Sequence, residues 1–170
     1  MPTRTAELQY LRRILAAHRD RFLHESGSDH SHEQYFYKYN DESIFLAQVE
    51  VSGAFKGEHW KSLTCVVGIY YRQFPGYGKP RLDPAGRPIP TYRQARLTIG
   101  FERTLDQSSI TSSLSNPILQ YDRNIWHVLE DESNLAEVLH DMAVGLREVG
   151  YPTAARPTFS RARMLEKERR

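Results

Sequence analysis

The sequence predicts an α+β protein: an antiparallel sheet of about five strands, with an N-terminal and a C-terminal helix packed on one face. Apolar residues recur at helical spacing near both ends of the 170-residue chain. Between them lie segments in which apolar and polar residues alternate, which is typical of strands with one covered face. Short turn-forming stretches join these segments, and strands joined by short turns pair antiparallel.

The composition indicates one globular domain in a reducing compartment. Hydrophobic residues make up 39% of the chain, which at this length is enough to form a core without disulfides. The single cysteine, Cys65, excludes an internal disulfide. No segment resembles a signal peptide or a membrane helix, so we expect a cytoplasmic protein without membrane contact. We expect residues 1–152 to form the domain and residues 153–170 a basic tail, helical or disordered.

Residues 5–24 are predicted to form the first helix. Spacings of three and four residues place one stripe along it, formed by Leu8, Leu11, Leu15, His18 and Phe22. Gly27 is expected to end this helix, because glycine readily adopts the left-handed conformation of a helix C-terminus. Residues 26–33 are then predicted to form a polar loop that carries two histidines.

Three strands are predicted to follow, at residues 35–39, 44–52 and 60–74. Alternate residues of the second and third are expected to face the core: Phe45, Ala47, Val49, Val51, Leu63, Cys65, Val67, Ile69 and Tyr71. The opposite face, with residues such as Ser62, Thr64, Gly68 and Tyr70, is expected to be half polar and open to solvent.

Residues 75–92 contain five prolines and three glycines and are predicted to form a long loop without regular structure. A further strand is predicted at residues 95–101. A connection rich in serine and threonine follows at residues 108–115. The last strand is predicted near Trp126.

The last helix is predicted to begin after Asp131 or Ser133, either of which can cap its free N–H groups. Its broad apolar face consists of Leu135, Val138, Leu139, Met142, Leu146 and Val149. Gly150 and Pro152 are expected to end it, because both residue types disfavour continuation of a helix.

Charge is segregated along the chain, although the net charge is only +2. Residues 72–96 carry six basic residues and one acidic residue, whereas residues 130–148 carry one basic and six acidic residues. From residue 156 onward there are six basic residues against two acidic ones. Segregated charge of this kind steers the choice of partner.

The basic segment 72–96 also contains tyrosines, and tyrosine and arginine dominate the energetics of protein interfaces. We therefore expect it to bind another protein, through Tyr77, Lys79, Arg81, Arg87, Tyr92 and Arg93. The alternative is a nucleic-acid-binding protein that uses this segment and the basic tail, by ring stacking and phosphate contacts. A solvated proline-rich loop without a partner fits the same composition and is the interpretation that assigns the segment no function.

No pattern of residues predicts a catalytic centre. His24, His30 and His32 resemble a metal cluster, but three or four converging ligands are not evident. Cys65 lies mid-strand among apolar residues, and the acidic residues 130–132 suit the start of a helix. Residues 76–80 lack the pattern of a phosphate-binding loop. We expect no enzyme, catalytic residue, cofactor or metal; a metal-dependent enzyme built on the three histidines is the alternative.

The chain resembles a group of bacterial domains of unknown function that are often associated with toxin–immunity loci. Those domains share an N-terminal helix, an antiparallel sheet, and a closing strand with a tryptophan before an amphipathic helix. The matching residues are Trp126, Val128, Leu135, Val138, Met142, Leu146, Gly150 and Pro152, and the central strand at residues 63–70 is also similar. The resemblance spans residues 5–152 and implies a non-enzymatic immunity or accessory factor that docks on a protein of the same bacterium. The long loop at residues 75–92 and the basic tail depart from that group.

Overall fold

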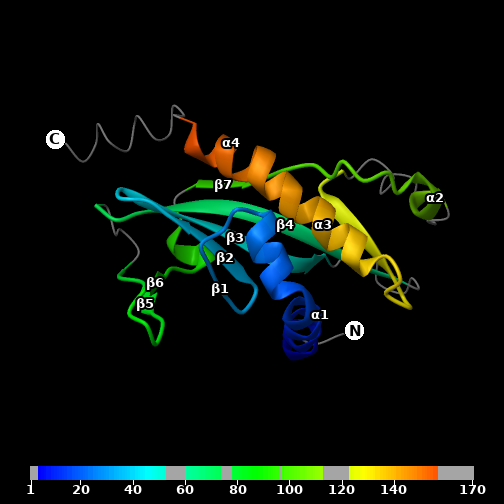
Figure 1. The fold of residues 1–170 in the computed structure, drawn as a ribbon, viewed down its shortest axis with the longest axis horizontal. Helices are drawn as coiled ribbons and strands as arrows, with labels where there is room; N and C mark the ends of the chain where they lie inside the picture. Colours follow the sequence, from blue (N-terminus) through cyan, green and yellow to red (C-terminus); the bar gives the residue numbers. More distant parts are fainter. Residues whose placement is uncertain (1–3, 53–59, 74–77, 96, 113–122, 157–170) are drawn as a thin grey trace.

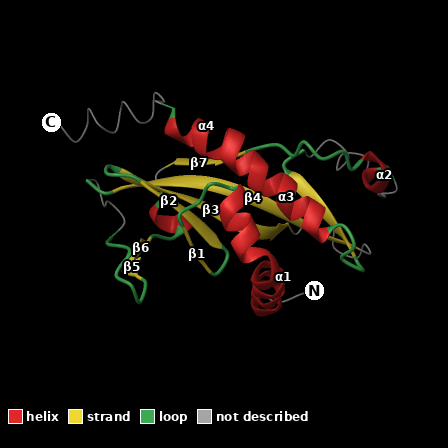
Figure 2. Cartoon of the chain, in the orientation of Figure 1, coloured by secondary structure: helices red, strands yellow, loops and turns green. Residues whose placement is uncertain are grey.

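The computed structural model is an α+β fold in which helices lie across one face of an antiparallel sheet (Figures 1 and 2). It describes residues 4–52, 60–73, 78–95, 97–112 and 123–156. The predicted fold class is confirmed, and the sheet has six strands within this described part of the chain.

The sheet is built around its longest strand, β4. Its strands are β1 (His30–His32), β2 (Tyr35–Tyr39), β3 (Ser43–Ser52), β4 (Trp60–Tyr71), β7 (Leu97–Gly100) and β8 (Ile125–Leu129). They follow the order β1-β2-β3-β4-β7, and every pair is antiparallel. The second edge of β4 is divided, because residues 60–64 pair with β8 and residues 66–69 pair with β7.

A polar loop was predicted at residues 26–33, but part of this segment forms a strand, β1. His30–His32 pairs with β2 in a tight hairpin, with His32 opposite Tyr35. Glu33 in the turn has a φ of 54°. The histidines of this region are therefore placed on a strand, where their directions are fixed by the sheet.

The helices are α1 (Arg4–Glu25), α2 (Ser108–Thr111), α3 (Leu135–Gly145) and α4 (Tyr151–Ala155), and a π-helical turn, η4 (Leu146–Gly150), joins α3 to α4. Side chains of α1, α3, η4 and α4 share one main core with the sheet. The predicted inward residues of β3 and β4 all belong to that core, with Phe45 and Val51 at its half-exposed margin. Both helical ends of the chain thus cover the same face, as predicted.

α1 buries a wider stripe than its spacing predicts. Its buried residues are Tyr10, Leu11, Ile14, Leu15 and Phe22. Leu8 and His18 are only half-buried. Gly27 ends the helix as expected: its φ is 68°, and its N–H donates to the His24 carbonyl oxygen at 3.2 Å.

The C-terminal helix continues through Gly150 and Pro152, so the predicted end was wrong. The chain stays helical to Ala155, by way of η4 (Figure 1). Pro152 lies in the first turn of α4, where the missing N–H costs little after a π turn. Gly150 gives room for packing, because a Cβ there would lie 2.9 Å from Leu146 Cδ1 and 3.2 Å from Phe101 Cδ1.

The predicted cap of α3 was also wrong. Asp131 Oδ1 accepts from the Ser133 N–H at 3.0 Å, inside the preceding turn. The residue at the cap position is Asn134, and its side chain makes no cap hydrogen bond. Its amide accepts from the Leu129 N–H at 2.9 Å and donates to the His127 carbonyl oxygen at 2.8 Å, which ties α3 to β8.

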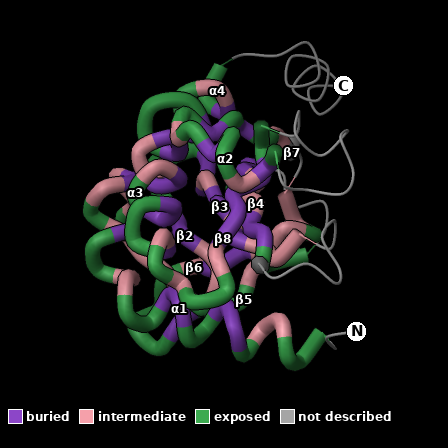
Figure 3. The backbone as a smooth tube through the Cα atoms, turned by 90° about the vertical axis from the view of Figure 1, so that its right-hand side faces the viewer, coloured by how far each residue is buried: buried purple, intermediate pink, exposed green. Residues whose placement is uncertain are grey.

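The opposite face of the sheet is covered over part of its length, contrary to expectation. Its buried residues form a second cluster: Tyr37, Ile44, Leu46, Tyr70 and Ile89. Ile89 belongs to segment 78–95, which contains β5 (Arg81–Leu82), β6 (Pro88–Ile89) and a 3₁₀ turn, η2 (Tyr92–Gln94). Figure 3 shows buried residues along the strands and along the helix sides that face them.

Candidate partner-binding site

Segment 78–95, predicted as an irregular loop, contains a hairpin with a defined tip. β5 and β6 pair antiparallel, with Arg81 opposite Ile89. At the tip, the Asp83 N–H donates to the Arg87 carbonyl oxygen at 2.8 Å, and the Arg87 N–H donates to Asp83 Oδ1 at 2.7 Å. Gly86 has a φ of 82°, which glycine adopts without strain. The prolines limit the strands to two residues each but do not prevent them.

Three tyrosines of β2, which we call the tyrosine clasp, hold this segment against the sheet: Tyr35, Tyr37 and Tyr39. Alternate residues of a strand share a face, and successive rings stack with 6.1 Å between their centroids. The Tyr37 hydroxyl donates to the Pro90 carbonyl oxygen and the Tyr39 hydroxyl to the Pro88 carbonyl oxygen, both at 2.9 Å. Directional hydrogen bonds therefore fix the hairpin segment, in addition to apolar contacts.

Burial makes the clasp tyrosines weaker acids. It raises the pKa of Tyr39 to about 12, and it raises the pKa of Tyr37 further. Burial also raises the pKa of Tyr35, and a backbone hydrogen bond from Tyr92 opposes that shift. The hydroxyls of the clasp thus remain protonated near neutral pH and can act as donors.

His30 of β1 links the sheet to the tip of the hairpin. Its Nε2 lies 2.8 Å from Oδ2 of Asp83, whose side chain is buried. Hydrogen bonds from the backbone, first that of Arg87, lower the pKa of Asp83. Burial lowers the pKa of His30 even though the Asp83 carboxylate opposes that shift. Near neutral pH the contact therefore joins an uncharged imidazole to a carboxylate.

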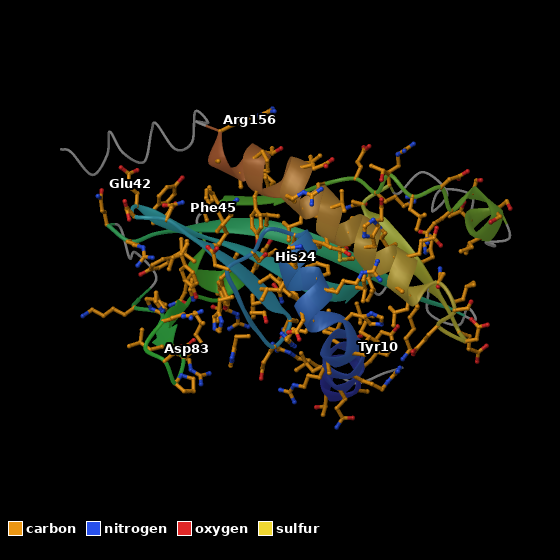
Figure 4. All side chains as sticks on the ribbon, in the orientation of Figure 1. Tyr10, His24, Glu42, Phe45, Asp83 and Arg156 are labelled. Atoms are coloured by element: carbon orange, nitrogen blue, oxygen red, sulfur yellow. The ribbon has the colours of Figure 1, made fainter. Side chains whose placement is uncertain are left out.

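The three histidines considered as a metal cluster are not brought together. Within the described ranges, no group of three or more His, Cys, Asp or Glu side chains could hold a metal ion. His30 contacts Asp83, whereas His24 lies on α1, well away from Asp83 in Figure 4. The structure thus gives the metal-dependent alternative no support in this region.

The outward side of the hairpin segment is cationic. The predicted binding residues Lys79, Arg81, Arg87 and Arg93 are all exposed. Tyr92 is half-buried and packs against the second cluster, so part of its ring supports the fold. Tyr77 lies outside the described residues.

Leu82 is a residue of this surface that sequence reasoning missed. It is 62% exposed, more than any other large hydrophobic side chain that the structure describes. The sequence feature that could have indicated its exposure is its position as an isolated leucine between Arg81 and the turn residue Asp83. Asp83 is the one acidic residue of segment 78–95, and its burial leaves the surface around Leu82 positively charged.

Two reactive side chains elsewhere are buried. Cys65 lies in the main core, as its strand position predicted, and burial raises the pKa of its thiol. His127 has no exposed surface; its burial, together with the nearby charge of Arg103, lowers its pKa to about 4. In this conformation neither side chain can reach a bound substrate. The absence of catalysis stays a prediction.

Comparisons of the chain with protein-family models, with curated proteins and with solved structures find no match. Across the described residues, no helix is both long enough and apolar enough to span a membrane.

Proposed function

We propose that the protein is a non-enzymatic binding factor that docks on another protein through segment 78–95. The observation that carries the proposal is that the hairpin segment is held to the sheet on its inward side and exposes a cationic tip on its outward side. Hydrogen bonds of the tyrosine clasp hold the inward side, where His30 also contacts Asp83, while Arg81, Leu82 and Arg87 are exposed.

A segment that is already ordered loses less conformational entropy when it binds. Arginine is enriched at protein interfaces, and its planar guanidinium can form paired hydrogen bonds with a carboxylate. Leu82 adds an apolar side chain beside these cations. The matching partner surface is acidic and has an apolar pocket at its centre.

The burial of aromatic rings favours a protein over single-stranded nucleic acid. Nucleic acid is held by exposed rings on which bases stack, beside cations that contact phosphates. Tyr70 and Tyr71 are buried, and Tyr92 is half-buried against the second cluster. The described hairpin surface thus offers charge without a free stacking platform.

In its most specific form, the proposal is that the partner belongs to the same bacterium and that the chain is an immunity-like or accessory factor. The architectural resemblance of its helices, sheet and closing tryptophan strand supports this form. Its test is whether the captured partner is a toxin or an enzyme whose activity falls when the chain binds.

The experiment is capture of partners by the untagged protein from its native host, with and without nuclease, followed by titration of the purified partner. The double variant Leu82→Ser/Arg87→Ala removes one apolar and one cationic side chain from the tip. We expect it to weaken partner binding by about tenfold or more, since truncating central interface residues typically has this effect.

The matched control is Val149→Ser/Arg147→Ala, which removes an exposed aliphatic side chain and an exposed arginine from η4. We expect this control to bind the partner as the unchanged protein does. Recovery of mostly nuclease-sensitive material, or equal affinity of the two double variants, would overturn the proposal.

A further inference from the structure

Among the described residues, the edge of β3 has no paired strand beyond the end of the β1–β2 hairpin. β2 pairs with β3 as far as Tyr35 opposite Gln48. One more hydrogen bond follows, from the Val49 N–H to the Gln34 carbonyl oxygen at 3.0 Å. The preceding residue, Glu33, lies in the turn that connects β1 to β2, so β2 extends no further along β3. β3 itself continues to Ser52, so its last residues extend beyond β2.

The backbone of Val51 faces this open edge. Hydrogen-bonding groups of an antiparallel strand alternate between its two sides, so Val51 points its N–H and C=O the same way as Val49. Val49 points toward β2, whereas no residue of β2 lies opposite Val51 in the described register. An extended chain could therefore pair with β3 here, as peptides do at other sheet edges.

A groove runs along this edge, between β3 and the first turns of α1. Its volume is about 460 Å³, and its apolar floor is formed by Leu8, Leu11, Val49 and Val51. The ion pair of Arg12 with Glu33, 3.0 Å long, joins α1 to the β1–β2 turn. The volume is in the range of small ligand sites.

The polar groups of the groove are mainly acceptors. Gln48 Oε1 is buried and has no hydrogen-bond partner among the described residues. Glu50 is half-buried, and its burial raises the pKa of its carboxyl group. Glu7 and Arg4 line the same groove, and Arg4 is the one cation among its described lining residues. A ligand that brings N–H donors and a positive charge satisfies these groups best.

We propose that this groove binds an extended segment of a partner protein, which adds to the edge of β3 and places a lysine or arginine beside Gln48 and Glu50. The main-chain groups of the segment pair with Val51, and its cation supplies a donor for Gln48 Oε1 and a charge opposite that of Glu50. This site is separate from the hairpin segment 78–95 and does not depend on the function proposed for it.

The test uses two synthetic peptides, acetyl-Thr-Val-Arg-Val-Thr-amide and the same peptide with glutamate in place of arginine. Each is titrated into the full-length protein to several millimolar while the backbone amide signals are followed by NMR. We expect saturable shifts centred on Val51 and Gln34 with the arginine peptide alone. Equal binding of the glutamate peptide, or no saturable shift with either peptide, would overturn the proposal.

Two variants sharpen the result. Glu50→Gln removes the carboxylate charge and is expected to weaken the arginine peptide about fivefold or more, whereas the exposed control Glu148→Gln leaves binding unchanged. Val51→Pro removes an N–H that points away from β4, a position at which edge strands accept proline, and Val51→Ala is the control that trims the same groove side chain but keeps the N–H. Loss of peptide binding with an otherwise preserved amide spectrum supports strand addition. If Val51→Pro does not fold, the Glu50→Gln comparison still decides.

Discussion

The two faces of the sheet are closed by different physical means. The face toward α1, α3 and α4 is covered by a large apolar core. The part of the other face beneath segment 78–95 has a smaller cluster, and the segment is held there by tyrosine hydroxyls on proline carbonyl oxygens. Apolar burial is strong but non-directional, whereas a hydrogen bond contributes less and fixes position. The comparison suggests that the helices supply stability and that the clasp supplies placement of the hairpin.

The largest effect is expected from Trp126 in the helix-covered core. It is fully buried, its Nε1–H donates to Asp141 Oδ2 at 2.9 Å, and its ring meets that of Phe101 edge-on. We expect Trp126→Ala to lower the free energy of unfolding by about 4 kcal/mol, because it leaves a cavity. Urea unfolding measures this loss. A loss below about 2 kcal/mol would mean that packing does not dominate this face.

The next effect is a pH dependence from His127, which follows Trp126 on β8 and so points to the opposite face. Its folded pKa of about 4 lies below the unfolded value near 6.5, so the unfolded state binds more protons between these values. The contribution of the neutral imidazole is complete above pH 6.5 and is lost as the pH falls to 4, by about 3 kcal/mol. Unfolding measured from pH 7 to 4 should show this slope.

The control for that slope is His127→Gln, which cannot titrate. The difference between the two proteins isolates the imidazole from carboxyl groups such as Asp141, whose pKa is lowered by its hydrogen bonds against the effect of burial. Identical slopes for the variant and the unchanged protein would contradict the assignment.

A smaller, local effect is expected from the clasp. Tyr37→Phe removes the hydroxyl that binds Pro90 and should lower the free energy of unfolding by about 1 kcal/mol. Hydrogen exchange at the Asp83 and Arg87 amides should speed up more than exchange within β4. The matched control is Tyr10→Phe, because the buried Tyr10 hydroxyl has no hydrogen-bond partner among the described residues. Equal losses for the two variants would remove the distinction between the faces.

The smallest effect is expected at the hairpin tip. Leu82 is mostly exposed, so Leu82→Ser should change the free energy of unfolding by less than about 0.5 kcal/mol. Urea unfolding checks this directly. A larger loss would mean that Leu82 supports the fold and is not free to contact a partner.

The features that could be predicted were those with a local period. Alternation along β3 and β4 placed Ala47, Leu63 and Val67 correctly in the core, because neighbouring residues of a strand face opposite ways. The continuation of the helix through Gly150 could not be predicted, since this glycine gives room for packing against Phe101, which is far away in sequence.

The candidate site was predictable only in its composition. Exposure of Arg81 and Arg87 follows from their charge. The docking of the hairpin depends on the hydrogen bond between Tyr37 and Pro90, which are far apart in the chain. No local pattern of tyrosine or proline residues predicts such a contact. The regular structure of segment 78–95 therefore depends on tertiary contacts, and its many prolines led to the prediction of an irregular loop.

The divided edge of β4 has a consequence for synthesis of the chain. The first half of β4 is completed by β8, with Trp60 opposite Leu129 and Thr64 opposite Ile125. A ribosome releases β4 well before β8, so this half of the central strand has one partner while the intervening residues are made. Long-range pairing of this kind slows folding, and an unpaired apolar strand edge favours association between chains. Nascent chains should thus need protection from each other until β8 has emerged.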